Sequence, residues 1–178
     1  MRTLKILTFS IILIAISACS SVRVTSDYDK EVDFTNFKTF DFTQEANDLP
    51  IMDLNRRRIL NAVTTEMELR GYQKQNSPDL LVDLHVSTEQ KVDMTSTTNW
   101  YGSSYHYGYW RGYTRNTIDV NQYTEGSLFI DLINTENNNL VWQGVGTKTL
   151  AENTQNQDEI IKKAVKKIFS QHPISPAN

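Results

Sequence analysis

The stretch LLVDLHVSTEQKVDM, from Leu80 to Met94, decides the fold. Its apolar and polar residues alternate, with Leu80, Val82, Leu84, Val86, Val92 and Met94 on one parity and Asp83, His85, Ser87, Glu89, Lys91 and Asp93 on the other. A period of two is that of a β-strand, because successive side chains point to opposite faces of a sheet. The stretch therefore predicts a long strand with one buried and one solvated face, which is typical of an antiparallel sheet.

Further strands are expected on both sides of this stretch. A strand beginning at Ile118 can run on to Ile133, and residues 140–147 return as its hairpin partner after a polar turn at 134–139. Alternating and aromatic-rich segments near residues 20–42 predict a first strand pair.

Two amphipathic helices are also expected. The first runs from about Asp53 to Arg70 and ends at Gly71, with an apolar stripe of Leu54, Ile59, Ala62, Val63 and Met67. The second precedes Pro173, and its stripe consists of Ile160, Ile161, Ala164, Val165, Ile168 and Phe169. The predicted order is β-β-α-β-β-β-α. The predicted fold class is α+β, with both helices on one face of a mostly antiparallel sheet of about five to six strands.

The first residues have the layout of a secretory signal. Arg2 and Lys5 precede an apolar run at 6–16, which is too short to cross a hydrocarbon core that needs ~20 helical residues. Residues 16–19, Ile-Ser-Ala-Cys, resemble the bacterial lipobox. The resemblance implies cleavage after residue 18 and lipid attachment to Cys19, the only cysteine, followed by a short tether and one domain within 19–178.

Charge and flanking residues narrow the location and the partners. Of 18 basic residues, Arg2 and Lys5 are lost with the leader, which leaves 16 against 21 acidic residues and a net charge of −5. This balance argues against nucleic acid as a partner, because phosphate binding needs a basic face. Ser20 and Ser21 provide no acidic retention signal. We therefore expect an outer-membrane lipoprotein that faces the periplasm.

No residue pattern indicates catalysis. The sequence contains no nucleophile elbow, phosphate-binding loop or metal-type histidine pair, so we expect neither an enzyme nor a cofactor. Asp83, His85 and Glu89 share the polar face of the long strand, where a metal site is conceivable. Side chains so arranged are more often simply solvated, and no metal site is predicted.

Residues 99–115 form the candidate interaction surface, as a hairpin loop between two strands. They hold five of the eight tyrosines and two of the three tryptophans, and the surface consists of Trp100, Tyr101, Tyr105, Tyr107, Tyr109, Trp110 and Tyr113. Tyr, Trp and Arg concentrate at protein interfaces. Three alternatives stay open: a loop with no specific ligand, a surface for an envelope protein, or a contact with glycan or peptidoglycan.

Several ordered motifs resemble the bacterial domain-of-unknown-function family 4136. They are Asp33-Phe34, Phe37-Lys38-Thr39-Phe40, Leu69-Arg70-Gly71-Tyr72, Pro78-Asp79-Leu80-Leu81-Val82, Tyr123-Thr124-Glu125-Gly126-Ser127-Leu128, Ile130-Asp131-Leu132 and Leu140-Val141-Trp142-Gln143-Gly144. The resemblance implies a periplasmic or outer-membrane lipoprotein without an established activity or catalytic residues. We expect a lipid-anchored envelope module for binding or assembly; the alternatives are an envelope hydrolase, a glycan-binding module and a purely structural lipoprotein.

Overall fold

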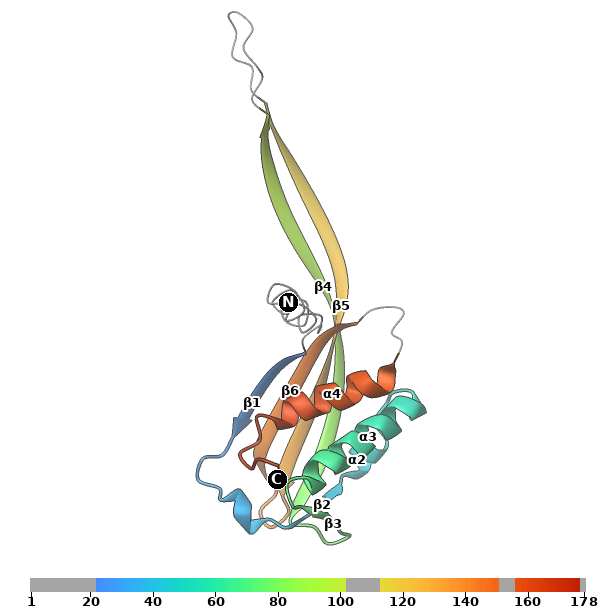
Figure 1. Cartoon of the computed structure of the whole chain (residues 1–178), viewed down its shortest axis with the longest axis vertical. Helices are drawn as coiled ribbons and strands as arrows, with labels where there is room; N and C mark the ends of the chain where they lie inside the picture. The colour runs from blue at the N-terminus through green and yellow to red at the C-terminus, as the bar shows by residue number, and fades with distance from the viewer. Residues whose placement is uncertain (1–21, 102–112, 151–155, 177–178) are drawn as a thin grey trace, which may run out of the picture.

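The computed structural model describes residues 22–101, 113–150 and 156–176, and it describes the side chains of residues 22–96, 121–150 and 156–176 (Figure 1). The elements in chain order are β1 (Arg23–Tyr28), the 3₁₀ turn η1 (Phe34–Asn36), β2 (Thr39–Phe42), α2 (Gln44–Asn47), α3 (Asp53–Glu68), β3 (Gln73–Lys74), β4 (Leu80–Tyr101), β5 (Tyr113–Asn134), β6 (Asn139–Leu150) and α4 (Gln157–Phe169).

All strands form one six-stranded sheet in the order β1-β6-β5-β4-β2-β3. The pairs β1/β6, β4/β5 and β5/β6 are antiparallel, whereas β2 runs parallel to both β3 and β4. The two main helices, α3 and α4, lie side by side on one face of the sheet (Figure 1). The predicted α+β class with two helices on one face is confirmed, and the sheet is mixed but mostly antiparallel.

The predicted first strand pair near residues 20–42 is wrong. β1 lies at one edge of the sheet and pairs with β6, whereas β2 lies near the other edge and pairs with β4. The connection from β2 to β4 contains α3, as parallel pairing requires a crossover rather than a tight turn. Alternation shows that each segment is a strand, but it carries no information on which distant strand is the partner.

The core fills the space between the sheet and the two helices. Its fully buried members include Phe40, Leu80, Val82, Ile130, Leu132 and Trp142 from the sheet and Val63, Met67, Val165, Ile168 and Phe169 from the helices. The Trp142 and Phe169 rings stack with centroids 5.4 Å apart. A Cβ on Gly146 would lie 2.7 Å from Ile168 Cδ1, so the absence of a side chain there lets α4 approach β6 closely.

The predicted helix stripe holds except at its start. Ile59, Ala62, Val63 and Met67 are buried, but Leu54 is 53% exposed. Leu54 belongs to the first turn of α3, beyond the part of the helix that faces the core. Gly71 has a φ of +89°. This left-handed conformation ends the helix as predicted.

β4 has two environments along one alternating pattern. Val82 and Leu84 are 0% and 3% exposed, whereas Val92 and Met94 are 49% and 74% exposed. The prediction that Val92 and Met94 are buried is therefore wrong. β2 pairs with β4 only at Leu80–Val82, and β6 ends at Leu150 opposite Thr124, so the later part of β4 leaves the covered sheet.

Candidate functional site

The later part of β4 and the first part of β5 form a projecting two-stranded ribbon, which we define as residues 91–101 paired with 113–123. The pairing runs without interruption from Lys91↔Tyr123 to Tyr101↔Tyr113. In the described part of the chain these two segments pair with each other alone. Figure 1 shows that the ribbon extends far beyond the helices and the rest of the sheet.

The predicted interaction surface falls at the far end of this ribbon. Trp100 and Tyr101 end β4, and Tyr113 begins β5. The backbone of Trp100 pairs with that of Thr114, so residues expected in a loop are strand. The other four members, Tyr105, Tyr107, Tyr109 and Trp110, lie outside the described residues, as does Cys19.

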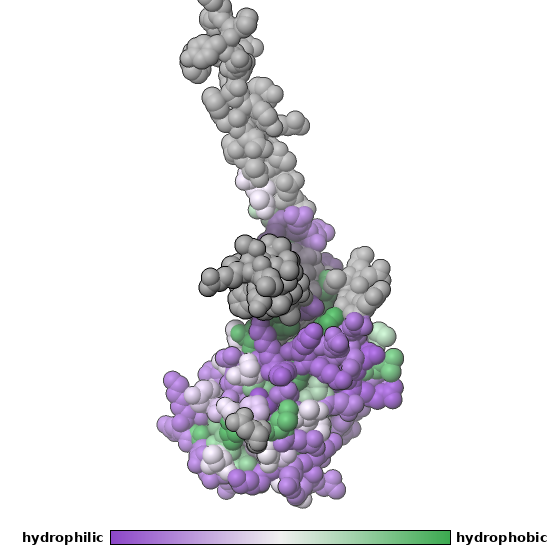
Figure 2. Space-filling view, viewed as in Figure 1, coloured by the Kyte–Doolittle hydropathy of each residue, from purple (hydrophilic) through white to green (hydrophobic). Residues whose placement is uncertain are grey.

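The described base of the ribbon is amphipathic. Val92 and Met94 have the parity of Val82 and Leu84, which is the parity of the helix-covered face. Glu89, Lys91 and Asp93 have the opposite parity. The exposed side chain of Leu150 continues the apolar face at the end of β6, over Gly126. Hydrophobic surface is visible where the ribbon leaves the body in Figure 2.

An ion cluster ties the base of the ribbon together on the other face. Lys91 Nζ lies 2.8 Å from Glu125 Oε2, and Arg23 also pairs with Glu125, whose side chain is only 7% exposed. The hydrogen bond from Lys91 lowers the pKa of Glu125, and the same bond raises the pKa of Lys91. The cluster joins β1, β4 and β5. The sequence did not predict this cluster. A signal was present, because Lys91 and Glu125 both have the polar parity of their strands, and these two strands are neighbours.

Asp83, His85 and Glu89 do not form one site. Asp83 accepts a hydrogen bond from Thr43 Oγ1 at 2.6 Å, and the His85 ring lies 5.8 Å from that of Phe129. Glu89 lies farther along the strand, 3.9 Å from Lys91. Within residues 22–101, 113–150 and 156–176, no group of three or more His, Cys, Asp or Glu residues could hold a metal ion.

Asp131 is a partly buried carboxylate on the polar face, beside Asp83. It stands opposite Asp83 in the β4/β5 register and accepts a hydrogen bond from Gln143 Nε2 at 2.9 Å. Partial burial raises the pKa of Asp131, and the charge of Asp83 raises it further. The carboxylates of Asp83 and Asp131 therefore repel each other. The hydrogen bonds that Thr43 donates to Asp83 and Gln143 donates to Asp131 partly compensate this repulsion.

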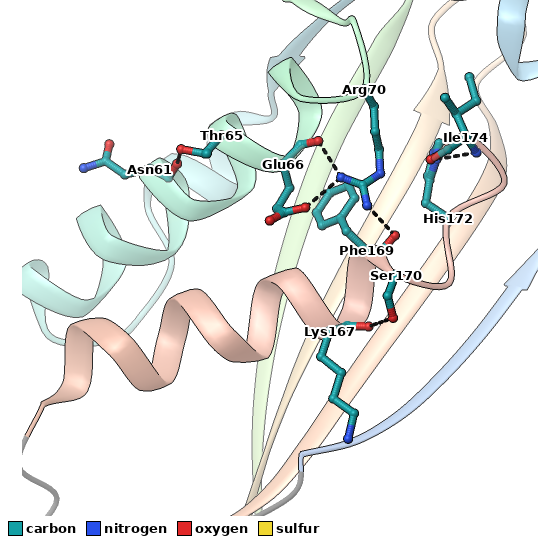
Figure 3. A network of polar contacts seen from close by, with 9 residues as sticks. All are labelled: Asn61, Thr65, Glu66, Arg70, Lys167, Phe169, Ser170, His172 and Ile174. Carbon is teal, nitrogen blue, oxygen red and sulfur yellow. Dashed lines mark hydrogen bonds and ion pairs between the residues drawn. The ribbon is translucent and has the colours of Figure 1, made fainter. Parts of the chain in front are cut away.

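A buried polar cluster lies at the opposite end of the body from the ribbon (Figure 3). Arg70 forms a 2.7 Å ion pair with Glu66 and donates a 2.7 Å hydrogen bond to the Phe169 carbonyl oxygen, so it joins α3 to the end of α4. His172 Nδ1 accepts a hydrogen bond from the Ile174 amide at 3.1 Å. Burial lowers the pKa of His172 to about 4, so the ring is neutral at pH 7.

Four atoms of this cluster have no hydrogen-bond partner among the described residues: Arg70 Nε, Tyr72 Oη, Trp142 Nε1 and His172 Nε2. The His172 ring lies 5.2 Å from that of Trp142 and 6.0 Å from that of Tyr72. The residues are at most 7% exposed. A closed position of this kind suits a structural role in holding the two helices together rather than contact with a large substrate.

A surface groove of about 440 Å³ separates α3 from α4. Its charged lining consists of four basic residues, Arg58, Lys162, Lys163 and Lys166, and two acidic residues, Glu66 and Asp158. Lys162 pairs with Asp158 at 2.7 Å, so part of its charge is already compensated. The groove therefore offers mixed charge without a defined polar constellation.

The sequence matches the model of the domain of unknown function DUF4136 over residues 24–174. The chain belongs to this family. In the structure, two motifs of this DUF4136 domain that lie far apart in sequence come into contact. The Asp79 carboxylate accepts hydrogen bonds from the Lys38 and Thr39 amides at 2.7 and 3.0 Å, and these bonds lower its pKa. Two motifs 40 residues apart thus meet where β2 begins to pair with β4.

Comparison with solved structures gives matches at low sequence identity. A PDZ domain protein from Parabacteroides distasonis matches with a TM-score of 0.51 and 18% identity, over 88% of this chain and 36% of its own. The DUF4136 chain thus corresponds to about a third of that protein. PelC from Paraburkholderia phytofirmans, a dodecamer, matches with a TM-score of 0.47 and 10% identity, over 84% of this chain and 96% of its own. A variant of PelC gives a TM-score of 0.48, with 11% identity, over 84% of this chain and 95% of its own.

These matches concern the fold, and no activity is transferred from them. No curated protein matches the sequence. Among the described residues, no helix combines the length and the hydrophobicity needed to span a bilayer.

Proposed function

We propose that this protein is a lipid-anchored component of the cell envelope, held by lipid on Cys19 at the periplasmic face of the outer membrane, and that it works as a non-catalytic binding or assembly module. The ribbon is its contact element. One observation carries the proposal: the two strands continue for eleven residue pairs past the end of β6, the last strand that pairs with either of them.

We do not expect such a ribbon to stabilise the fold. An isolated two-stranded hairpin is at best marginally stable in water, because it has no second layer on which to bury side chains. Its unpaired edges and its aromatic far end are features that proteins use to bind partners. At the proposed location, the periplasmic face of the outer membrane, the available partners are an envelope protein or peptidoglycan.

The described residues favour binding over hydrolysis. The polar residues that a hydrolase could use, Asp83, His85 and Glu89, point to separate partners along the sheet. General acid–base catalysis needs such groups within hydrogen-bond reach of one reacting centre. A purely structural lipoprotein would need no partner at the ribbon, and the crosslinking experiment below distinguishes this alternative from the proposal.

The anchor is tested by the mass of the N-terminal peptide of protein purified from the membranes of its own host. We expect a peptide that begins at Cys19 and carries acyl chains. A bare thiol, or a leader that is still attached, contradicts the anchor.

The contact element is tested by photo-crosslinking in the native envelope. A crosslinker replaces the exposed Thr95 at the ribbon or, as the matched control, the exposed Asn137 in the turn at the other end of β5. We expect products at 95 that are absent at 137, and their masses distinguish protein from glycan. Equal products at both positions, or none at 95, contradict the proposal and favour the structural alternative.

A further inference from the structure

The chain that leads from the anchor is fixed to the body almost immediately. Val22 is 7% exposed, and its carbonyl oxygen accepts a hydrogen bond from Lys167 Nζ at 2.6 Å. Arg23 pairs with Glu125 and already belongs to β1. Only three residue steps separate Cys19 from Val22. A fully extended chain covers at most ~3.5 Å per step, so the anchor lies within roughly 10 Å of the body.

This attachment point lies at the base of the ribbon. Arg23 is level with Thr147 of β6, which is level with Ser127 of β5 and Ser87 of β4. Figure 1 shows β1 starting at the end of the body from which the ribbon projects. From Thr88 to Tyr101 the ribbon side of β4 continues for about 13 residue steps at ~3.3 Å each, roughly 43 Å. The ribbon is therefore much longer than the tether.

A bilayer that holds Cys19 therefore passes within roughly 10 Å of the attachment point at the base of the ribbon. The described side chains at the ribbon base suit such a surface, because one face carries Val92, Met94 and Leu150, which are 49%, 74% and 50% exposed. Their exposed neighbours on this face, Gln90 and Gln122, are polar but uncharged. The other face carries the charged residues Glu89, Lys91 and Asp93. An amphipathic element of this kind places its apolar face at the boundary between headgroups and acyl chains.

We propose that the apolar face of the ribbon base, formed by Val92, Met94 and Leu150, docks on the lipid surface of the membrane that holds the Cys19 anchor. The inference rests on the proposed lipid anchor and names the lipid surface as a ligand of the same ribbon. The attached lipid raises the local concentration of this surface, so a contact too weak for binding from solution becomes populated.

The test uses the mature lipidated protein with a single added cysteine. Because Cys19 is the only native cysteine and its thiol carries the lipid, an environment-sensitive fluorophore reacts only with the added one. Met94→Cys places the label on the apolar face, and Asp93→Cys places it one residue away on the charged face. Asn137→Cys labels the far end of the body. All three positions are exposed, so the labels do not disturb the core.

In vesicles of phosphatidylethanolamine and phosphatidylglycerol, we expect a blue-shifted emission and loss of iodide quenching at 94, a smaller change at 93 and none at 137. Lipidated protein that floats with the vesicles but shows the same water-exposed emission at 94 and 137 overturns this inference and leaves the anchor intact. A mass that reveals an unmodified Cys19, with protein that does not float, overturns the anchor and this inference together.

Discussion

Apolar and polar side chains alternate both at the start of β4 and at the base of the ribbon, but the apolar side chains are buried at the start and exposed on the ribbon. At the start of the strand, Val82 and Leu84 pack under α3 and α4, whereas ten residues later Val92 and Met94 face outward on the ribbon. Alternation therefore encodes a two-faced strand, and the surroundings decide what each face meets. In the body the apolar face meets helices, and on the ribbon we propose that it meets lipid. Val82 and Leu84 thus stabilise the fold, whereas Val92 and Met94 are available for contact with a partner.

The largest effect on stability is expected at the buried end of the body. Arg70→Ala leaves Glu66 buried without its cation, so we expect a loss of about 3–5 kcal/mol in the free energy of unfolding. Urea denaturation followed by circular dichroism measures it. Arg57→Ala is the matched control, because Arg57 pairs with Asp53 at 3.0 Å with 63% of its side chain exposed. We expect Arg57→Ala to lower the free energy of unfolding by less than about 1 kcal/mol. Equal losses for the two variants would show that the buried pair is no more important for stability than the exposed pair.

His172 should make the body sensitive to acid. Its pKa is about 4 in the folded protein against an ordinary 6.5, so the unfolded chain takes up the proton first as the pH falls. The stability from neutral His172 is complete above pH 6.5 and is lost as the pH falls toward 4, by roughly 3 kcal/mol in all.

Denaturation at a series of pH values measures this loss. His172→Phe keeps an aromatic ring among Phe34, Trp142 and Phe169 but cannot take up a proton, and we expect a flatter profile between pH 6.5 and 4. Parallel profiles for the parent and the variant would show that other groups cause the acid sensitivity.

A smaller loss of stability is expected for Val82→Ala, and Val92→Ala is its matched control, because both valines lie on the same face of β4. Val82→Ala removes methyl groups from a fully buried side chain and should cost about 2 kcal/mol. Val92→Ala removes the same groups from a side chain that is 49% exposed and should cost less than about 0.5 kcal/mol. Similar losses would mean that the base of the ribbon belongs to the cooperative core.

The sequence predicted the local features of this structure better than the contacts between distant segments. Local alternation predicted the long strand, the β5/β6 hairpin and the two-helix face, because side-chain periodicity is a local property. The pairing of β1 with β6 and the end of the helix cover above Val86 depend on distant segments, so the pattern missed them. The aromatic candidates could be found by composition alone, whereas the Arg23–Glu125–Lys91 cluster required the register of three strands.

If the ribbon is a contact element and not part of the core, the body must fold without it, and one deletion tests this most directly. Replacing residues 92–122 with Asn-Gly joins Lys91 to Tyr123, which are paired in the sheet, through a two-residue turn that suits a hairpin. We predict a free energy of unfolding within about 1 kcal/mol of that of the parent, since an isolated hairpin adds little stability. A variant that fails to fold, or loses several kcal/mol, would contradict the account and make the ribbon part of the fold itself.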